Sequence, residues 1–287
     1  MPALWMILAS LLFACMGVCV KLGADRFGIA ELTFYRGLAG LLFMAVFMRS
    51  RGTAFRTQHW RLQLTRAVAG SIALGCYFFA ISLLPLAAAV TLNYTSPIFV
   101  ALLLALWFRE PLRRLAIGAV LLGFLGVVVL LRPTIAPEQW LGAVAGLASG
   151  LIASLAYINV RELGRAGEPE SRTVFYFSCV TCAGAVPFVI GSGGFTAPDA
   201  GGAALILGVG VFGTAAQLAM TRAYRVGATI VAANLAYSTV IFASLFGMLI
   251  WGEVLPAAAW LGIGMIMASG ILITRARAPV PNTARGD

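Results

Sequence analysis

Polar and aromatic residues that could bind a small molecule interrupt two long apolar stretches of the sequence. The first, 91–112, reads TLNYTSPIFVALLLALWFREPL, and the second, 234–255, reads NLAYSTVIFASLFGMLIWGEVL. Laid side by side without gaps, they pair Tyr94 with Tyr237 and end on the same Glu-x-Leu, which indicates an internal repeat. Amide, phenol and hydroxyl groups are costly within an apolar span unless they find a partner, so the two clusters predict a ligand-binding surface.

The first cluster contains a proline that the second lacks. Pro97 has no backbone N–H and frees a carbonyl about one turn earlier, so we expect an unwound or kinked polar segment there. Val240 occupies the equivalent position, and we therefore expect the two copies to behave differently. The alternative is that the serine and threonine hydroxyls of both clusters bond only to their own helices.

Other apolar stretches extend this candidate surface. Tyr77 and Phe78 belong to an aromatic group, which is also typical of a protein core or a lipid-facing surface. Tyr157 and Gln217 lie in the expected sixth and eighth helices. The residues that we expect along a substrate pathway are Tyr77, Phe78, Asn93, Tyr94, Ser154, Tyr157, Gln217, Asn234 and Tyr237.

A strip of small residues runs along the expected helix 140–161. Its members, Gly142, Gly146, Gly150 and Ser154, recur every four residues. Such a strip lets helix backbones approach closely, and it predicts tight packing. A surface on which helices slide during a conformational change is a compatible alternative.

Arg36 is the one basic residue expected well inside an apolar helix. It follows Glu31 by just over one turn, so the two could form an ion pair. Arg36 could also bond a backbone carbonyl, extend to the membrane surface, or bind a carboxylate of a ligand. The repeat places Phe177 at the equivalent position, which makes this charge asymmetric between the two halves.

The sequence contains no motif of a soluble enzyme. The patterns HExxH, GxSxG and the P-loop are absent, and the single histidine, His59, falls in an expected loop. Cys179 and Cys182 have a metal-like spacing, but no second pair or nearby histidine accompanies them, so we interpret them as small packing residues. We expect no catalytic residue, no cofactor and no bound metal.

Composition places the 287-residue chain in a lipid bilayer. Hydrophobic residues make up 61% of it and charged residues 10%, whereas soluble domains have about 25% charged residues. Apolar stretches of about 20 residues match the helix length that crosses a bilayer. They predict an all-α integral membrane protein with about ten transmembrane helices, at 3–22, 29–48, 65–84, 86–108, 113–131, 140–161, 172–191, 203–222, 228–251 and 257–274.

Lysine and arginine fall mainly in alternate loops. Three of them, Lys21, Arg26 and Arg132, lie on one expected side of the membrane. The sixteen on the other side are Arg49, Arg51, Arg56, Arg61, Arg66, Arg109, Arg113, Arg114, Arg161, Arg165, Arg172, Arg222, Arg225, Arg275, Arg277 and Arg285. Because basic residues are enriched in cytoplasmic loops, we expect both termini in the cytoplasm. Five helices per half then invert the second repeat, 137–287, relative to the first, 1–136.

The order, spacing and duplication of these motifs resemble those of the drug/metabolite transporter superfamily, specifically its EamA-type ten-helix exporters. The resemblance covers nearly the whole chain. The residues that carry it are Phe13 to Gly17 with Lys21, Phe34 to Gly37, Tyr94 to Pro97 with Glu110, and Tyr237 with Glu253.

The resemblance implies a basket of ten helices in which the first, third, fourth, sixth, eighth and ninth surround a central path, while the fifth and tenth are peripheral. It also implies export of amino acids or similar small metabolites across the inner membrane by alternating access, with the amino-acid exporters as the most similar branch. Relatives commonly carry asparagine where Met16 lies on this pathway, so that polar contact is missing here.

Other functions fit parts of the sequence. A carrier of nucleotide-linked or phosphorylated sugars would need several basic residues at mid-membrane depth, and only Arg36 is expected there. An intramembrane enzyme acting on lipid would need a nucleophile or a metal cluster, and a passive channel would show no saturation or counterflow. As partners we expect a small-molecule substrate and the bilayer, no nucleic acid, and a monomer or weak dimer.

The topology can be tested with reporter fusions. A reporter that is active only in the cytoplasm should be active when fused to the C-terminus and inactive when inserted in the first loop, beside Asp25, because the basic residues are distributed so unequally. Enzyme activity of each fusion in intact cells measures the side. A C-terminal fusion that reports the outer side would exclude both this topology and the inverted repeat.

Overall fold

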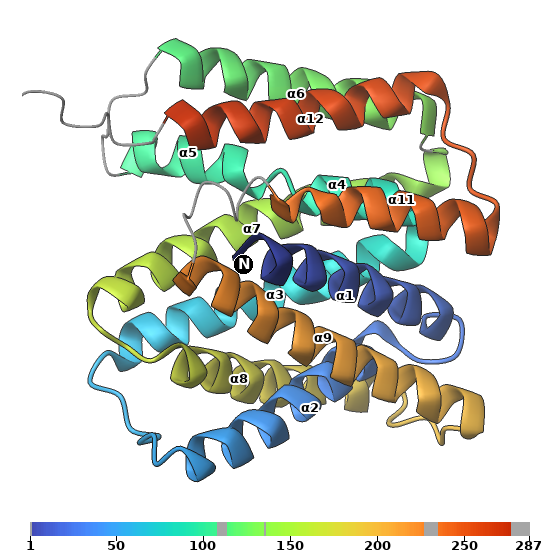
Figure 1. Ribbon diagram of the computed structural model, residues 1–287. Coiled ribbons are helices and arrows are strands. Elements are labelled where there is room, and N and C mark those ends of the chain that lie inside the picture. Colours follow the sequence, from blue (N-terminus) through green and yellow to red (C-terminus); the bar gives the residue numbers. More distant parts are fainter. Residues whose placement is uncertain (1, 108–113, 135, 227–234, 277–287) are drawn as a thin grey trace, which may run out of the picture.

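The computed structural model describes residues 2–107, 114–134, 136–226 and 235–276, and within these ranges the chain is helical and contains no strand. Most of the expected spans are recovered within a few residues (Figure 1). The elements are α1 Pro2–Gly23, α2 Ile29–Ser50, α3 Trp60–Leu83, α4 Leu86–Asn93, α5 Ser96–Trp107, α6 Arg114–Thr134, η1 Pro137–Gln139, α7 Trp140–Arg165, α8 Glu170–Gly191, α9 Ala200–Val226, α11 Ser238–Trp251 and α12 Ala257–Ala276.

In the described part of the chain, six helices are long and apolar enough to cross a membrane: α1, α2, α3, α7, α8 and α9. Shorter apolar segments at 86–100, 117–130, 238–251 and 257–272 lie in the remaining expected spans. Large hydrophobic side chains such as Val46 and Phe188 are highly exposed on the outside of the bundle, as lipid-facing residues are. The expectation of an all-α, multi-pass membrane protein is confirmed.

The expected helix 86–108 is divided in two. α4 ends at Asn93 and α5 begins at Ser96, which confirms the interrupted polar segment. The repeat copy is interrupted as well, because Tyr237 forms a turn immediately before α11. Val240 replaces the proline in that copy, so this break forms without a proline. The two breaks are not identical, because Tyr94 and Thr95 both form the first turn and Tyr237 alone forms the second.

Both interruptions contain the same side-chain hydrogen bond. Thr95 Oγ1 donates to the carbonyl of Leu92 at 2.6 Å, and Ser238 Oγ donates to the carbonyl of Leu235 at 2.5 Å. These donors and acceptors are equivalent in the repeat. A hydroxyl that donates to the carbonyl three residues earlier competes with the backbone N–H groups that would otherwise donate to that carbonyl. It can therefore favour a break in the helix without a proline.

Helices from the two halves pack as pairs. α1 packs on α9, α3 on α7, α2 on α8 and α6 on α12, while α11 contacts α1 and α4 contacts α7. Figure 1 shows α6 and α12 together at one edge and α2 and α8 at the opposite edge, with α1, α3, α7 and α9 between them. The fifth and tenth expected helices, which are α6 and α12, are therefore peripheral.

The small-residue strip of α7 lies against the first helix break. A Cβ atom added at Gly150 would lie 2.9 Å from the carbonyl oxygen of Leu92 and 2.6 Å from Thr95 Oγ1. At Gly146 an added Cβ would lie 2.9 Å from Leu92 Cδ1, and at Gly142 it would lie 2.9 Å from Leu83 Cβ. The prediction of tight packing is confirmed, and the absence of side chains lets α7 approach the broken backbone.

Replacing Gly150 with leucine should therefore destabilise the bundle. Overpacked sites cost about 1–3 kcal/mol, and here the neighbour includes backbone that cannot rotate away. Thermal unfolding of the purified variant measures the loss. Gly164→Leu, in the same helix with nothing near the added side chain, should be neutral or slightly stabilising. Equal unfolding temperatures for the two variants would show that α7 does not depend on this contact.

Candidate functional site

Four tyrosines gather where the two helix breaks meet. The rings of Tyr94 and Tyr237 have centroids 5.9 Å apart, and the Tyr94 hydroxyl lies 2.8 Å from Thr239 Oγ1. Tyr77 of α3 and Tyr157 of α7 lie within electrostatic range of Tyr94. The structure thus brings together four expected pathway residues from four separate segments, and we refer to them as the tyrosine cluster.

The members of the tyrosine cluster differ in how deeply they are buried and in whether their hydroxyls have a hydrogen-bond partner. The Tyr237 hydroxyl is buried and has no hydrogen-bond partner. Tyr157 is 47% exposed, whereas Tyr77 is buried. A phenol can both donate and accept a hydrogen bond, so the cluster places polar groups inside an otherwise apolar bundle.

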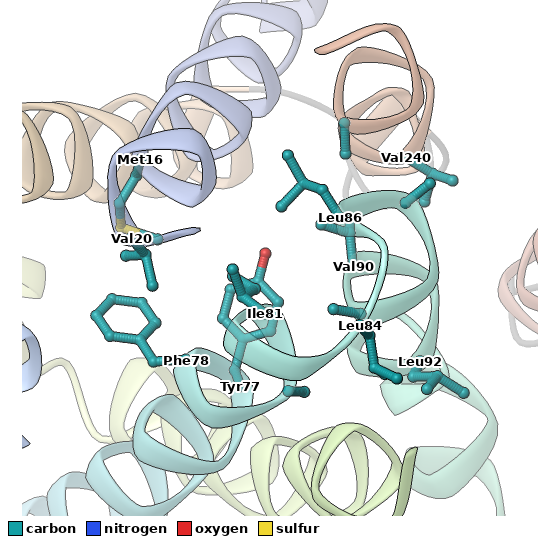
Figure 2. Close-up of a cluster of buried hydrophobic side chains, with 14 of the residues drawn as sticks. Met16, Val20, Tyr77, Phe78, Ile81, Leu84, Leu86, Val90, Leu92 and Val240 are labelled. Carbon is teal, nitrogen blue, oxygen red and sulfur yellow. The ribbon is translucent and has the colours of Figure 1, made fainter. Parts of the chain in front are cut away.

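The apolar side of this region is formed by α1, α3 and α4. Figure 2 shows Met16 and Val20 of α1 near Phe78 of α3, with the Tyr77 ring directed between α1 and α4. Met16 and Phe78 are fully buried. Met16 also packs against α9, because its Sδ lies only 2.9 Å from where a Cβ on Gly213 would be. In this structure the two residues belong to the packed core beside the tyrosines.

The remaining expected pathway residues that the structure describes already have partners within the protein. Asn93 Nδ2 donates to Ser149 Oγ of α7 at 3.0 Å, and the Ser154 hydroxyl bonds back to the carbonyl of Leu151 at 2.5 Å. Gln217 of α9 is half-buried and already engaged with a partner. Asn234 lies outside the described residues.

The Glu31 carboxylate accepts hydrogen bonds from loop residues and does not pair with Arg36. Its Oε1 accepts a hydrogen bond from the backbone N–H of Thr196 at 2.6 Å, and its Oε2 accepts one from the N–H of Gly28 at 3.1 Å. The possible Glu31–Arg36 ion pair does not form. Arg36 is 2% exposed, and its Nη2 donates only a long bond of 3.5 Å to the carbonyl of Gly213.

A second buried arginine, Arg66, was expected at the edge of a loop. α3 begins at Trp60, so Arg66 lies in its second turn and is only 7% exposed. The guanidinium carbons of Arg36 and Arg66 lie 5.4 and 4.3 Å from the centroid of the Phe177 ring. A desolvated cation–π contact contributes about 2 kcal/mol, and burying an unpaired ion costs several kcal/mol. Both charges are therefore incompletely compensated.

An ion pair closes the bundle at the end where α1 and α11 finish. Lys21 Nζ pairs with Glu253, and it also donates to the carbonyl of Leu84 at 3.0 Å. Glu253 Oε2 accepts a hydrogen bond from the N–H of Leu86 at 3.0 Å. Lys21 lies 4.9 Å from the ring centroid of Trp251. This pairing could not be predicted from the sequence, because 232 positions separate the two residues.

The opposite end of α3 is fastened by Glu168, in the turn between α7 and α8. The Glu168 carboxylate accepts hydrogen bonds from Thr57, Gln63 and Arg172 at 2.7, 3.2 and 2.9 Å. Burial raises the pKa of this carboxyl, but the hydrogen bonds and the charge of Arg172 outweigh it and hold the pKa below the usual value. The loop that leads into α3 is thus attached to the start of α8.

The chemistry available at this site is binding and not bond cleavage. Among the described residues no group of three or more histidine, cysteine or acidic side chains could hold a metal ion. What the bundle centre offers is phenols, hydroxyls and two guanidiniums supplied by both halves of the chain. Such groups can hold and release an organic molecule.

Known proteins resemble this chain over nearly its full length. The pseudopaline exporter CntI of Pseudomonas aeruginosa is 32% identical over 98% of this chain and 95% of its own. An uncharacterised transporter of Helicobacter pylori is 29% identical over 93% and 92%, and a riboflavin transporter of Vibrio cholerae is 25% identical over 95% and 92%. A solved crystal structure superposes with a TM-score of 0.68 at 20% identity, covering 94% of this chain and 95% of that one, which shows the fold.

The family comparison agrees with these relatives. The model of the EamA-like transporter family matches residues 1–132 and again 140–275. Family and relatives alike are transporters, so the protein is a membrane transporter and not an enzyme. With both segments matched, the chain belongs to the EamA-like transporter family.

Proposed function

We propose that this protein exports amino acids or similar small metabolites across the inner membrane by alternating access through a path between α1, α3, α7, α9 and the two broken helices. The observation that carries the proposal is the meeting of the two helix breaks at Tyr94 and Tyr237. Broken helices expose polar backbone and side chains at membrane depth, which is where transporters built from repeats bind cargo. The export direction is supported by the function named for the Pseudomonas relative.

The cargoes named for the relatives differ from one another. One relative exports pseudopaline and others transport riboflavin. Membership of the family therefore does not choose between amino acids and other small metabolites. The carrier of phosphorylated or nucleotide-linked sugars remains the second candidate, and the finding that favours it is that Arg66 joins Arg36 as a buried basic residue.

We propose that the Lys21–Glu253 pair is the outer gate of this path. It joins the end of α1, the turn between α3 and α4, and the end of α11. Alternating access requires these ends to separate, so the ion pair must break in each transport cycle. Its side chains are only 15% exposed, which makes the pair stronger than one in open solvent.

The gate can be tested with a double-mutant cycle. Lys21→Met and Glu253→Gln should each lower the transport rate. The double variant should lose less than the two single losses added together, because either change removes the same contact. The expected coupling energy is about 1–3 kcal/mol. Uptake of radiolabelled cargo into proteoliposomes measures it. Arg26→Gln with Asp199→Asn removes an exposed pair and should have little effect. Strict additivity at Lys21 and Glu253 would exclude a shared gating role.

We propose further that transport is facilitated and not driven by protons. A proton-coupled carrier generally has an acid near mid-membrane that binds and releases the proton. Among the described residues, Glu31 and Glu253 lie near helix ends and are engaged with other groups. The expected third acid, Glu110, lies outside the described residues.

Transport by purified protein in liposomes should accordingly proceed without a pH gradient and change little when one is imposed. Initial uptake rates for radiolabelled amino acids, measured with and without the gradient, provide the test. Empty liposomes and saturation with unlabelled cargo control for leakage. Accumulation above equilibrium that depends on the pH gradient, and that Glu31→Gln or Glu253→Gln abolishes, would contradict the facilitator.

A further inference from the structure

We propose that Arg36 and Arg66 together form a site that binds two carboxylates of the cargo. The site rests on the proposed transport function, and it narrows the cargo to a small dicarboxylic compound. It consists of the two guanidiniums, the Phe177 ring that both contact and the neighbouring hydroxyl of Ser178. The sequence offered a ligand carboxylate as one possible partner of Arg36, but it did not bring Arg66 to the same place, because Arg66 was counted with the loops.

The two arginine heads converge although their helices run in opposite directions. A Cβ added at Gly70, four residues after Arg66, would lie 3.1 Å from Arg66 Nη1 and 3.1 Å from the Phe177 ring. A Cβ added at Gly40, four residues after Arg36, would lie 3.8 Å from Arg36 Nη1. Each head therefore extends along its own helix into space that a glycine leaves open. Since α2 and α3 are antiparallel, the heads approach the same ring.

The donors of this site are buried and unpaired. Arg36 Nε, Arg66 Nε, Arg66 Nη1 and the Ser178 hydroxyl have no hydrogen-bond partner. The two arginines are 2% and 7% exposed. Neither guanidinium forms an ion pair in the part of the chain that the structure describes, because Glu31 is bound to Thr196 and Glu168 to Arg172. Buried charges are normally paired, so the arrangement lacks an anion.

Stacking on Phe177 does not satisfy these groups. The ring interacts with the face of a guanidinium, whereas all five N–H donors point outward in its plane. Arg36 Nη2 already donates its long bond to the carbonyl of Gly213. Arg36 Nε, Arg66 Nε and Arg66 Nη1 have no partner, so they can bond an oxyanion while the faces stay stacked. The ring fixes the orientation of both heads, and the Tyr157 phenol, within electrostatic range of Arg66, links the site to the tyrosine cluster.

The chemistry of the donors selects the ligand class. A guanidinium presents parallel N–H groups that match a carboxylate or a phosphate in a two-point contact. Two separate guanidiniums fit a molecule with two separate carboxylates better than one with a single anionic group. A phosphate ester uses the same donors, so the experiment must distinguish the two.

The test measures binding to the full-length protein in lipid nanodiscs. Thermal unfolding is followed with succinate, glutarate and adipate, which vary the distance between carboxylates, and with alanine and glycerol 3-phosphate. At least one dicarboxylate should raise the unfolding temperature, and alanine should not. Titrating that dicarboxylate should give a Kd at least about thirtyfold weaker in Arg36→Gln and in Arg66→Gln, because each removes one buried charged partner.

Matched variants separate binding from a structural role. Arg61→Gln makes the same change on an exposed arginine of α3 and should leave the dicarboxylate shift intact. Arg66→Lys keeps the charge without the planar fork and should bind with intermediate affinity. Without ligand, Arg66→Gln should unfold at the wild-type temperature or above it, since an unpaired charge is removed. The proposal would be overturned if Arg66→Gln unfolded at a lower temperature, Arg66→Lys unfolded at the wild-type temperature, and no dicarboxylate raised the unfolding temperature of the wild type. Arg66 would then have a structural role only.

Two further results separate this inference from the transport proposal. Saturable alanine transport in proteoliposomes that neither Arg36→Gln nor Arg66→Gln alters would keep the exporter and overturn the dicarboxylate site. Dicarboxylate binding that both variants lose, in a protein that transports none of these compounds, would keep the site and overturn the exporter. A thermal shift with glycerol 3-phosphate alone would overturn the carboxylate assignment in favour of phosphate.

Discussion

A bilayer offers no hydrogen bonds to a broken helix, and the rest of this structure depends on that constraint. Each break must be satisfied from within the protein. Thr95 and Ser238 supply hydroxyls to carbonyls at the two breaks, and Gly150 brings the backbone of α7 against the first. The packing of α7 on α3 and α4 follows from this approach, as does the gathering of tyrosines beside the breaks. The polar groups that we propose to bind cargo are therefore positioned by the same contacts that keep the bundle intact.

Among the described residues, charged side chains at the two ends of the bundle form ion pairs, whereas the buried arginines between the ends do not. Lys21 and Glu253 neutralise each other at one end, and Glu168 and Arg172 do so at the other. Arg36 and Arg66 lie between these ends, where both stack on the Phe177 ring and neither has an acidic partner in the described part of the chain. A transporter gains from such an imbalance, because a cargo that completes the charge balance is bound best where it is most shielded from water.

Much of the fold follows from periodicity and composition alone. Apolar runs predicted the helices, and Pro97 in the first of the duplicated segments predicted the break there. The second break, at Tyr237, was not predicted, because Val240 replaces the proline. The individual contacts could not be predicted in the same way. Glu31 was the nearest acid in sequence to Arg36, yet a loop residue, Thr196, binds it. Arg66 was misplaced because helix α3 starts five residues earlier than its apolar run, a boundary that depends on the loop being fastened to Glu168. Long-range pairing is set by tertiary packing, which one sequence does not display.

The stacking of Arg36 on Phe177 has a consequence for how such a chain could arise. The internal repeat makes these two residues counterparts, and Tyr94 and Tyr237 are counterparts that also touch. Positions near a twofold axis meet their own equivalents, so in a dimer of identical five-helix subunits the same place would hold two arginines or two phenylalanines. Two facing cations would repel, and two rings would carry no charge. Because this chain carries both copies and they differ at this position, it can place a cation on one side and an aromatic face on the other, which identical subunits cannot do.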